Sequence, residues 1–345
     1  MKLTMNKTVV TFGEIMMRLN PKGFQRFVQA DEMEISYGGG EANVAVSLAN
    51  YGLNARHITK LPANELGQSA LNELRRFGVD TSYIVRGGER LGLYFIEKGA
   101  SQRPSKVIYD RKDSAFALSA AGDFNWDDIF KGADWFHFTG ITPALSASLA
   151  DICLEACKKA KEKGLSVSCD LNYRKKLWTK EQACKVMSSL MPYIDLCIAN
   201  EEDASDVFGI AAERTDITGG KLDSEGYVGV AKKLCERFGC KKVAITLRGS
   251  ISASVNEWAA MLYDGTEASF SKKYTIQIVD RVGGGDSFGS ALIYALLENY
   301  GRADAVEFAV AASALKHTIE YDFNHVSVDE VKALAAGNAS GRVQR

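Results

Sequence analysis

Apolar residues along the chain form two kinds of segment in alternation, some with helical spacing and others as short continuous runs. Several segments carry apolar residues at helical spacing and stop at a glycine, which suits the left-handed backbone that closes a helix. These predicted helices are residues 41–51, 65–77, 145–163 and 227–238, followed by Gly52, Gly78, Gly164 and Gly239. Short apolar runs separate or follow them at residues 165–170, 194–199 and 241–247. The second run is almost wholly apolar, as expected of a strand that is buried on both faces.

The short alternation of strands and helices predicts an α/β fold, with a mostly parallel sheet covered by helices on both faces. Two segments, residues 15–35 and 91–112, break this alternation and look like extended chain with polar alternation. They could be long loops or could pair as a small antiparallel sheet, and two strand-like insertions of similar size favour a lid. We therefore assign these two segments to a β lid and residues 1–14, 36–90 and 113–345 to an α/β core.

Composition narrows the class of protein. The 345 residues carry 42 Lys and Arg against 43 Asp and Glu, so the net charge is −1 and no basic field for nucleic acid is expected. No apolar run approaches membrane-spanning length, and the N-terminal residues lack the features of a secretion signal. Seven cysteines without a C-x-x-C pair argue against a disulfide framework or a zinc ribbon. We expect a cytoplasmic protein that binds neither nucleic acid nor membrane.

The strongest local signal is a run of three glycines, Gly283, Gly284 and Gly285, that opens directly onto a predicted helix ending near Asn299. Backbone N–H groups at such a helix N-terminus lie at the positive end of the helix dipole, and no side chain obstructs a phosphate there. The motif therefore predicts an anion site. Asp286 follows in the first turn, where a carboxylate is either a stabilising partner of the dipole or a base aimed at the same phosphate.

Two familiar nucleotide motifs are absent. A P-loop needs a Ser or Thr after its Gly-Lys pair, but Gly220-Lys221 is followed by Leu222. The dinucleotide fingerprint needs a third glycine, and the two candidate loops carry Phe288 and Asn43 at that position. A Walker site is excluded, and a dehydrogenase is the weaker interpretation of these loops.

A second glycine run, Gly38, Gly39 and Gly40, also opens a predicted helix and is followed by Asn43. A polar amide beside a close backbone approach suits hydrogen bonding to a hydroxylated ligand, and the alternative is a plain helix entry. Taken together, the two runs suggest a substrate at one helix N-terminus and a transferred phosphate at the other.

These residues resemble the signatures of a known family. Residues 37–43 resemble the N-terminal Gly-Gly signature of the ribokinase-like carbohydrate kinases, the PfkB family, and residues 280–286 resemble its C-terminal signature with Gly284 in place of Ala. Asn200 lies where the family carries N-x-x-E, with Asp203 replacing the Glu. The resemblance covers nearly the whole chain. It implies a ribokinase-like three-layer α/β/α core, a small β lid, and the cofactors ATP and Mg²⁺, with Asp203 contacting Mg²⁺ through water.

Within the family the chain is most similar to the 2-keto-3-deoxygluconate kinases. The segments that carry this likeness are residues 91–99, 103–111, 114–115, 170–178 and 340–345, and Leu91 stands where a Thr is common. The resemblance implies ATP-dependent phosphorylation of 2-dehydro-3-deoxy-D-gluconate at its terminal 6-hydroxyl. Such a sugar acid, unlike a neutral sugar, brings a carboxylate that needs a fixed cation.

Arg111 is the first candidate for that cation. Tyr109 and Arg111 are two apart on a predicted strand and would share one face. The planar guanidinium suits a carboxylate, although a surface arginine on a solvated strand is the alternative. Arg174 follows the strand that ends at Asp170, at the edge where α/β proteins place ligands, and could bind sugar, phosphate or both.

By resemblance, Asp286 is the general base, and the N–H groups of Gly283, Gly284 and Gly285 stabilise the transferred phosphoryl group. The implied sugar contacts are Gly38, Gly39, Asn43, Tyr94, Tyr109, Arg111, Arg174 and Asp322. The implied nucleotide contacts are Asn172, Asn200, Thr246, Arg248, Gly249, Gly283 and Gly285, with the helix around residues 312–316 near adenine.

Two other functions stay open at this point. A fructokinase or ribokinase type of enzyme would act on a neutral sugar, and a sugar-binding regulator would keep the fold without turnover. The intact run from Gly283 to Asp286 argues against the regulator, because a binder needs no base. The resemblance also favours a homodimer paired through the lid strands. The sequence leaves open the C4 epimer, regulation, and whether a monovalent cation binds near Asp280.

Overall fold

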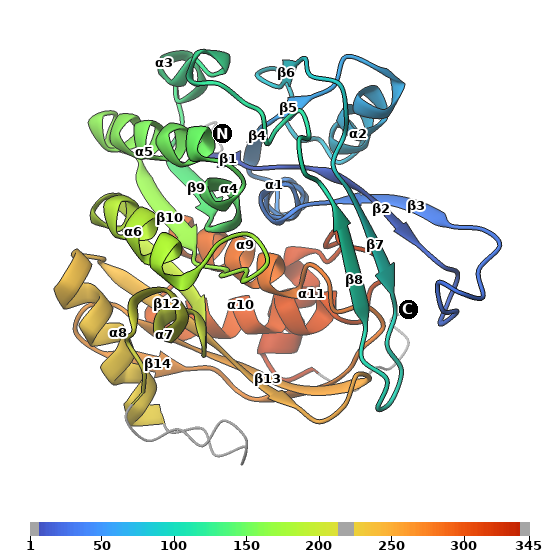
Figure 1. The fold of residues 1–345 in the computed structure, drawn as a ribbon. Coiled ribbons are helices and arrows are strands. Elements are labelled where there is room, and N and C mark those ends of the chain that lie inside the picture. Colours follow the sequence, from blue (N-terminus) through green and yellow to red (C-terminus); the bar gives the residue numbers. More distant parts are fainter. Residues whose placement is uncertain (1–6, 213–223, 339–345) are drawn as a thin grey trace, which may run out of the picture.

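The strands and helices form a three-layer α/β/α core with a separate small sheet (Figure 1), which confirms the predicted fold class. The computed structural model describes residues 7–212 and 224–338. Residues 220–222 and 340–345, which entered the sequence analysis, lie outside this part. None of the helices in the described ranges is long and apolar enough to cross a membrane.

The central sheet has nine strands, and its larger part is parallel. In spatial order the strands are β14 (Ala268–Phe270), β13 (Val255–Tyr263), β12 (Lys242–Ser250), β11 (Leu196–Asn200), β10 (Ser166–Asp170), β9 (Trp135–Thr139), β1 (Thr8–Phe12) and β4 (Asn54–Ile58), and β15 (Tyr274–Gln277) also pairs with β13. All pairs from β4 to β12 are parallel, and β13 pairs antiparallel with its neighbours. The carboxyl ends of the parallel strands therefore meet at one edge.

Helices cover both faces of this sheet. Alternate strand residues point to opposite sides, and apolar residues on both sides are buried by helices. Val10 and Phe138 pack on one face with α3 (Trp126–Ile129), α5 (Ala147–Glu162), α6 (Lys180–Leu190), α7 (Asp203–Phe208) and α8 (Ser224–Phe238). Val9 and Ile198 pack on the other with α1 (Gly40–Asn50), α2 (Glu65–Arg76), α9 (Gly284–Leu297), α10 (Arg302–Lys316) and α11 (Val328–Ala335). The remaining short elements are α4 (Ile141–Ala144), η1 (Ala121–Asp123), η2 (Met191–Tyr193) and the parallel pair of β5 (Lys60–Leu61) and β6 (Val85–Arg86).

The predicted helix ends are confirmed. The four glycines that close α1, α2, α5 and α8 all adopt left-handed backbone, with φ of 86° at Gly52, 75° at Gly78, 78° at Gly164 and 79° at Gly239. A residue with a Cβ rarely adopts this conformation, so the glycine fixes the end of each helix locally.

The small sheet has the strand order β3 (Glu34–Gly38), β2 (Met16–Asn20), β7 (Leu93–Glu97) and β8 (Lys106–Asp110). Its outer pairs are antiparallel, but the central pair of β2 and β7 is parallel. The expectation of a purely antiparallel sheet was therefore wrong. Between β3 and β7 the chain passes through the core as α1, β4 and α2, and it re-enters the small sheet in the direction of β2.

Candidate active site

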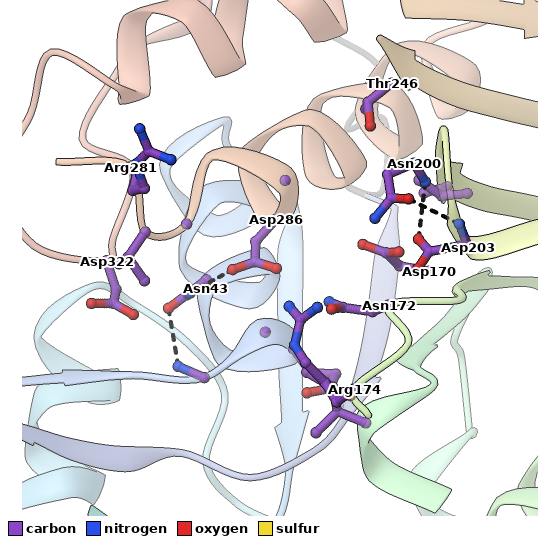
Figure 2. A pocket seen from close by; sticks show the side chains of 18 of the residues that line it. Asn43, Asp170, Asn172, Arg174, Asn200, Asp203, Thr246, Arg281, Asp286 and Asp322 are labelled. Atoms are coloured by element: carbon purple, nitrogen blue, oxygen red, sulfur yellow. Dashed lines mark hydrogen bonds between the residues drawn. The ribbon is translucent and has the colours of Figure 1, made fainter. Parts of the chain in front are cut away.

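A cavity of about 390 Å³ lies between the small sheet and the carboxyl ends of the core strands. Met16 and Tyr94 line it from the small sheet, and Ile198 and Asn200 line it from β11. Figure 2 shows the polar side chains that converge on it. The predicted site residues that line it are Gly39, Asn43, Tyr94, Tyr109, Arg111, Asn172, Arg174, Asn200, Asp203, Thr246, Arg248, Gly283, Gly285, Asp286 and Asp322.

Three predicted glycines do not line the cavity. A Cβ at Gly38 would lie 2.2 Å from the Asp322 carboxylate, and one at Gly284 would lie 2.4 Å from the His317 ring. Gly249 packs on Glu257 in the same way, with 3.0 Å to a carboxylate oxygen. Close packing against other side chains therefore accounts for these three glycines. The N–H of Gly284 donates to the Arg281 carbonyl oxygen at 3.4 Å.

Asp286 lies in the first turn of α9, where Gly283 caps the helix with a left-handed φ of 79°. Its carboxylate accepts a hydrogen bond of 2.7 Å from Nδ2 of Asn43, which belongs to the first turns of α1. Burial by the surrounding protein raises the pKa of Asp286 to about 7, the Asn43 hydrogen bond opposes this, and the charges of Asp322 and Glu41 add to it. A carboxyl group with a pKa near neutrality can act as a general base.

Arg111 is not free in this structure. Its Nε donates to Glu14 at 2.7 Å, and its Nη2 also contacts the same carboxylate. Glu14 is buried directly after β1 and also accepts from Ser114 at 2.5 Å. Glu14 was not predicted as a site residue, because it lies 97 positions from its arginine partner and no local motif marks it. Among the residues that the structure describes, Nη1 has no hydrogen-bond partner, so it is available to a further acceptor.

Asn200 and Asp203 organise the turn between β11 and α7. The two carboxylate oxygens of Asp203 accept from the backbone N–H groups of Asn200 at 2.9 Å and Tyr173 at 3.1 Å. The side-chain oxygen of Asn200 accepts in turn from the N–H groups of Glu202 and Asp203. These contacts hold the turn in place at the rim of the cavity.

Asp170, at the end of β10, faces the cavity between these groups and Asp286 (Figure 2). Burial and the charges of Asp203 and Asp286 hold its pKa well above the usual value, and Arg174 opposes this. Buried like charges of this kind are relieved by a cation. Within the described residues, however, no group of three or more His, Cys, Asp or Glu forms a preformed metal site.

Three arginines also line the cavity, and Figure 2 shows Arg281 beside Asp322 and Arg174 beside Asn172. The three are Arg174, Arg248 and Arg281, and burial together with the nearby Arg248 lowers the pKa of Arg281. Two guanidinium groups that repel each other are stabilised by an anion with several oxygens. The cavity is also lined by Arg281, Trp258, Asn256 and His317, which were not identified as site residues from the sequence.

Arginines that line the cavity, together with a carboxyl group of pKa about 7 at a glycine-rich helix N-terminus, suit an enzyme that transfers a phosphoryl group. The chain matches the model of the pfkB family carbohydrate kinases over residues 6–320. It belongs to this family.

Several relatives extend the likeness. A Haloferax volcanii protein named 2-dehydro-3-deoxygalactonokinase is 34% identical, over 98% of this chain and 99% of its own. A Bacillus subtilis protein named 2-dehydro-3-deoxygluconokinase is 29% identical over 90% of each chain. The crystal structure of 2-dehydro-3-deoxygluconokinase from Thermotoga maritima has 52% identity and a TM-score of 0.93, covering 96% of this chain and 99% of its own. The protein is therefore a carbohydrate kinase with the fold of these enzymes.

Proposed function

We propose that this kinase transfers the γ-phosphate of ATP to the 6-hydroxyl of 2-dehydro-3-deoxy-D-gluconate, with Asp286 as the general base. The observation that carries the proposal is the Asp286 carboxyl at the N-terminus of α9, with its pKa near 7 and its hydrogen bond to Asn43. Asp286 accepts the proton of the attacking hydroxyl. The exposed N–H end of α9 at Gly285 stabilises charge on the transferred phosphoryl group.

The sugar acid is supported by the groups at the small-sheet end. The Arg111 guanidinium has Nη1 left beside its Glu14 pair, and Glu14 fixes the orientation of that guanidinium. The Tyr109 hydroxyl group belongs to the same strand region and lines the same cavity. The 52% identity to the Thermotoga maritima enzyme, over nearly the full length of both chains, agrees with a sugar acid as substrate.

The residues present fit Mg²⁺ carried by the nucleotide. Burial and then the neighbouring carboxylates raise the pKa of Asp170, and Asn172 and Asn200 line the cavity near it. Mg²⁺ prefers oxygen ligands and keeps several waters and phosphate oxygens, so one or two protein carboxylates suffice. Asp170 suits this role better than Asp203, whose oxygens are engaged by backbone N–H groups. When bound, Mg²⁺ would neutralise charge on the nucleotide phosphates.

The galactonate epimer of the sugar acid is a second candidate, because the Haloferax volcanii relative bears the name of that activity. An ADP-release assay compares 2-dehydro-3-deoxygluconate, its galactonate epimer, fructose and ribose. We expect the largest kcat/KM for the gluconate and little turnover of the two neutral sugars. A preference for fructose or ribose would move the protein to the neutral-sugar kinases, and absence of turnover with every substrate would favour a regulator.

Arg111→Ala tests the role of the carboxylate separately. Loss of a charge-assisted hydrogen bond of about 1.5–3 kcal/mol should lower kcat/KM for the acid roughly 10- to 150-fold. Fructose should lose much less, so the ratio of the two losses is the decisive quantity. Because Ala leaves Glu14 buried without its partner, the double variant Glu14→Gln/Arg111→Ala controls for misfolding. Equal losses for both sugars would contradict the carboxylate role.

We also propose that residues 15–35 and 91–112 act as a lid. Tyr94 from β7 and Met16 from β2 line the cavity from this sheet, so closure would exclude water from the sugar. Hydrogen exchange in both segments should slow when sugar acid is added, and unchanged exchange at saturating substrate would contradict the lid. A homodimer and a cytoplasmic location stay predictions.

A further inference from the structure

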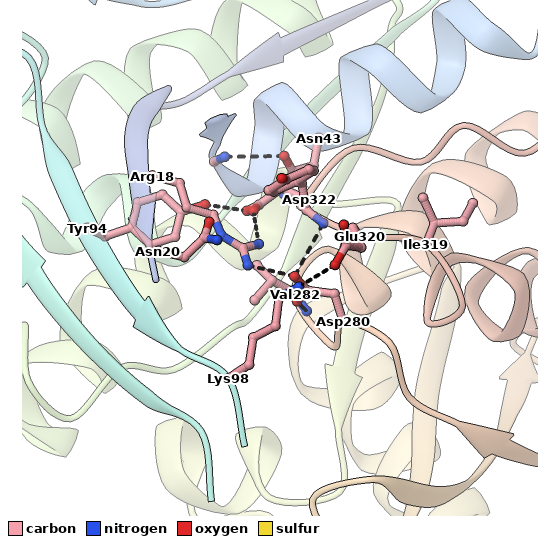
Figure 3. A network of polar contacts seen from close by, with 12 residues as sticks. Arg18, Asn20, Asn43, Tyr94, Lys98, Asp280, Val282, Ile319, Glu320 and Asp322 are labelled. Atoms are coloured by element: carbon pink, nitrogen blue, oxygen red, sulfur yellow. Dashed lines mark hydrogen bonds and ion pairs between the residues drawn. The ribbon is translucent and has the colours of Figure 1, made fainter. Parts of the chain in front are cut away.

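A cluster of buried charges connects the small sheet with the core. Arg18 from β2 is fully buried, and it donates to Asp280 at 2.6 Å and to Asp322 at 2.8 Å (Figure 3). Asp322 also accepts from the hydroxyl group of Tyr94 on β7 at 2.6 Å. Arg18 was not predicted from the sequence, and whether a monovalent cation binds near Asp280 was left open there.

Lys316, the last residue of α10, supplies a second buried cation to this cluster. Its side chain is fully buried, and its ammonium donates to the backbone carbonyls of Tyr321 at 2.7 Å and Ile319 at 3.3 Å. Tyr321 adopts a left-handed φ of 63°, and its N–H donates to Asp280 at 3.2 Å. The turn after α10 therefore presents two carbonyl oxygens to the ammonium group. Backbone carbonyl oxygens bind metal cations in the same way.

The charges of the cluster balance without an added ion. Arg18 forms ion pairs with the carboxylates of Asp280 and Asp322, Lys316 interacts with the same two through its charge, and each of the four is almost fully buried. Burial lowers the pKa of Lys316 to about 8 and the two carboxylates oppose this, so the side chain is charged at neutral pH. A third cation in the same place would leave an unpaired buried charge, which is strongly unfavourable. The residues present therefore do not fit a monovalent ion.

We propose that the ammonium of Lys316 replaces a monovalent cation and positions the anion-binding turn of α9. Lys316 lies close to this turn, because a Cβ built at Gly283 would lie 3.3 Å from Cε of Lys316 and 2.1 Å from the Asp322 carbonyl oxygen. The segment after α10, which Lys316 holds through the Tyr321 carbonyl, therefore packs closely against the left-handed Gly283. Lys316 is not among the residues that line the cavity, so in this proposal it is a positioning residue and not a ligand of the substrates.

The inference rests on the kinase activity, and the first test needs no variant. With ATP and sugar acid as tetramethylammonium salts, wild-type kcat should stay within about twofold when K⁺, Na⁺ or NH₄⁺ is added at matched ionic strength. Clear activation of the wild type by K⁺ would overturn the proposal.

The second test compares two substitutions at one position. Lys316→Ala opens room beside the same carbonyl and carboxylate oxygens, so kcat should fall about 10-fold, less than the loss of a direct oxyanion donor, and K⁺ or NH₄⁺ should restore it. Lys316→Met fills that room with an uncharged chain, and the same salts should not restore it. The KM for the sugar should change little in either variant.

A thermal measurement separates this inference from the proposed function. An ion that binds the folded state stabilises it, so K⁺ should raise the Tm of Lys316→Ala relative to tetramethylammonium, with no substrate present. Lys98→Ala is the matched control, because Lys98 pairs with Glu320 at 2.8 Å beside the same turn, and its Tm should not respond to K⁺. A folded Lys316→Ala protein whose Tm and kcat ignore K⁺ and NH₄⁺ would overturn the proposal, whichever sugar the enzyme prefers.

Discussion

A run of three glycines stands at the N-terminus of α1 and another at the N-terminus of α9. The two N-termini meet at the hydrogen bond between Asn43 and Asp286. At α1 the glycines are needed for contact between protein segments. A Cβ at Gly39 would lie 1.9 Å from the Glu14 carbonyl oxygen, although its φ of 168° suits any residue. The run at α1 therefore brings Asn43 and the backbone of Glu14 close to the cavity.

At α9 the three glycines serve different purposes. Gly283 provides the left-handed cap and Gly284 packs on the His317 ring, whereas a Cβ at Gly285 would meet no atom within 4 Å. Gly285 also lines the cavity. One glycine motif can therefore serve protein packing at two positions and leave space for a ligand at the third.

The largest effect is expected at the charged partner of the Asn43–Asp286 pair. Asp286→Asn keeps the size and the hydrogen-bonding capacity but removes the proton acceptor, so kcat should fall by ~10²–10⁴. Stability should not fall. Because burial raises the folded pKa of Asp286 from 3.8 to about 7, the wild type loses the corresponding stability as pH rises through that interval. The variant lacks this loss, and its Tm at pH 8 should equal or exceed that of the wild type. A kcat near wild type would reduce Asp286 to a helix-terminus residue.

Alanine at the two glycine runs should separate folding from activity. Gly39→Ala forces a Cβ into the Glu14 carbonyl, and overpacking of this kind costs typically about 1–3 kcal/mol. Gly285→Ala meets no protein atom and removes a glycine from a helix, so stability should stay equal or rise by about 0.4–1 kcal/mol. Its methyl group would occupy the anion site, and activity should fall. Thermal unfolding and steady-state kinetics of the two variants check this. Loss of stability in Gly285→Ala with unchanged activity would mean that Gly285 serves packing and not the anion site.

The predicted elements succeeded where the determining interaction is local. Gly52 and Gly164 end their helices through their own backbone conformation, and the apolar run that became β11 is buried on both faces by its own composition. The parallel pairing of β2 with β7 could not be predicted in this way, because it depends on where the chain re-enters the small sheet.

In the candidate site, too, residues in local motifs could be predicted and residues defined by long-range contacts could not. Asp286 and Asn43 follow glycine runs, so their motifs indicated them, and the structure brings them within hydrogen-bond distance. Arg111 could be chosen for its chemistry, but its partner Glu14 lies on another element. Arg18 sits in a strand of mixed polarity, and only the two carboxylates that arrive from residues 280 and 322 explain its complete burial. Long-range charge pairing leaves no periodic signal in the chain.

The smallest effect on activity is expected at Asn43, the uncharged partner in the hydrogen bond with Asp286. The Asn43 hydrogen bond lowers the pKa of Asp286, so Asn43→Ala should raise that pKa above about 7. A general base acts as the carboxylate, and the rising limb of the profile of kcat/KM against pH should move to higher pH. Asn43→Asp adds a like charge beside Asp286 and should move the limb further than Ala does. The rate deficit of Asn43→Ala should therefore be larger at pH 6 than at pH 9. A deficit that does not depend on pH would mean that Asn43 acts on the sugar alone, and the two helix N-termini would then be coupled through the substrate rather than through this hydrogen bond.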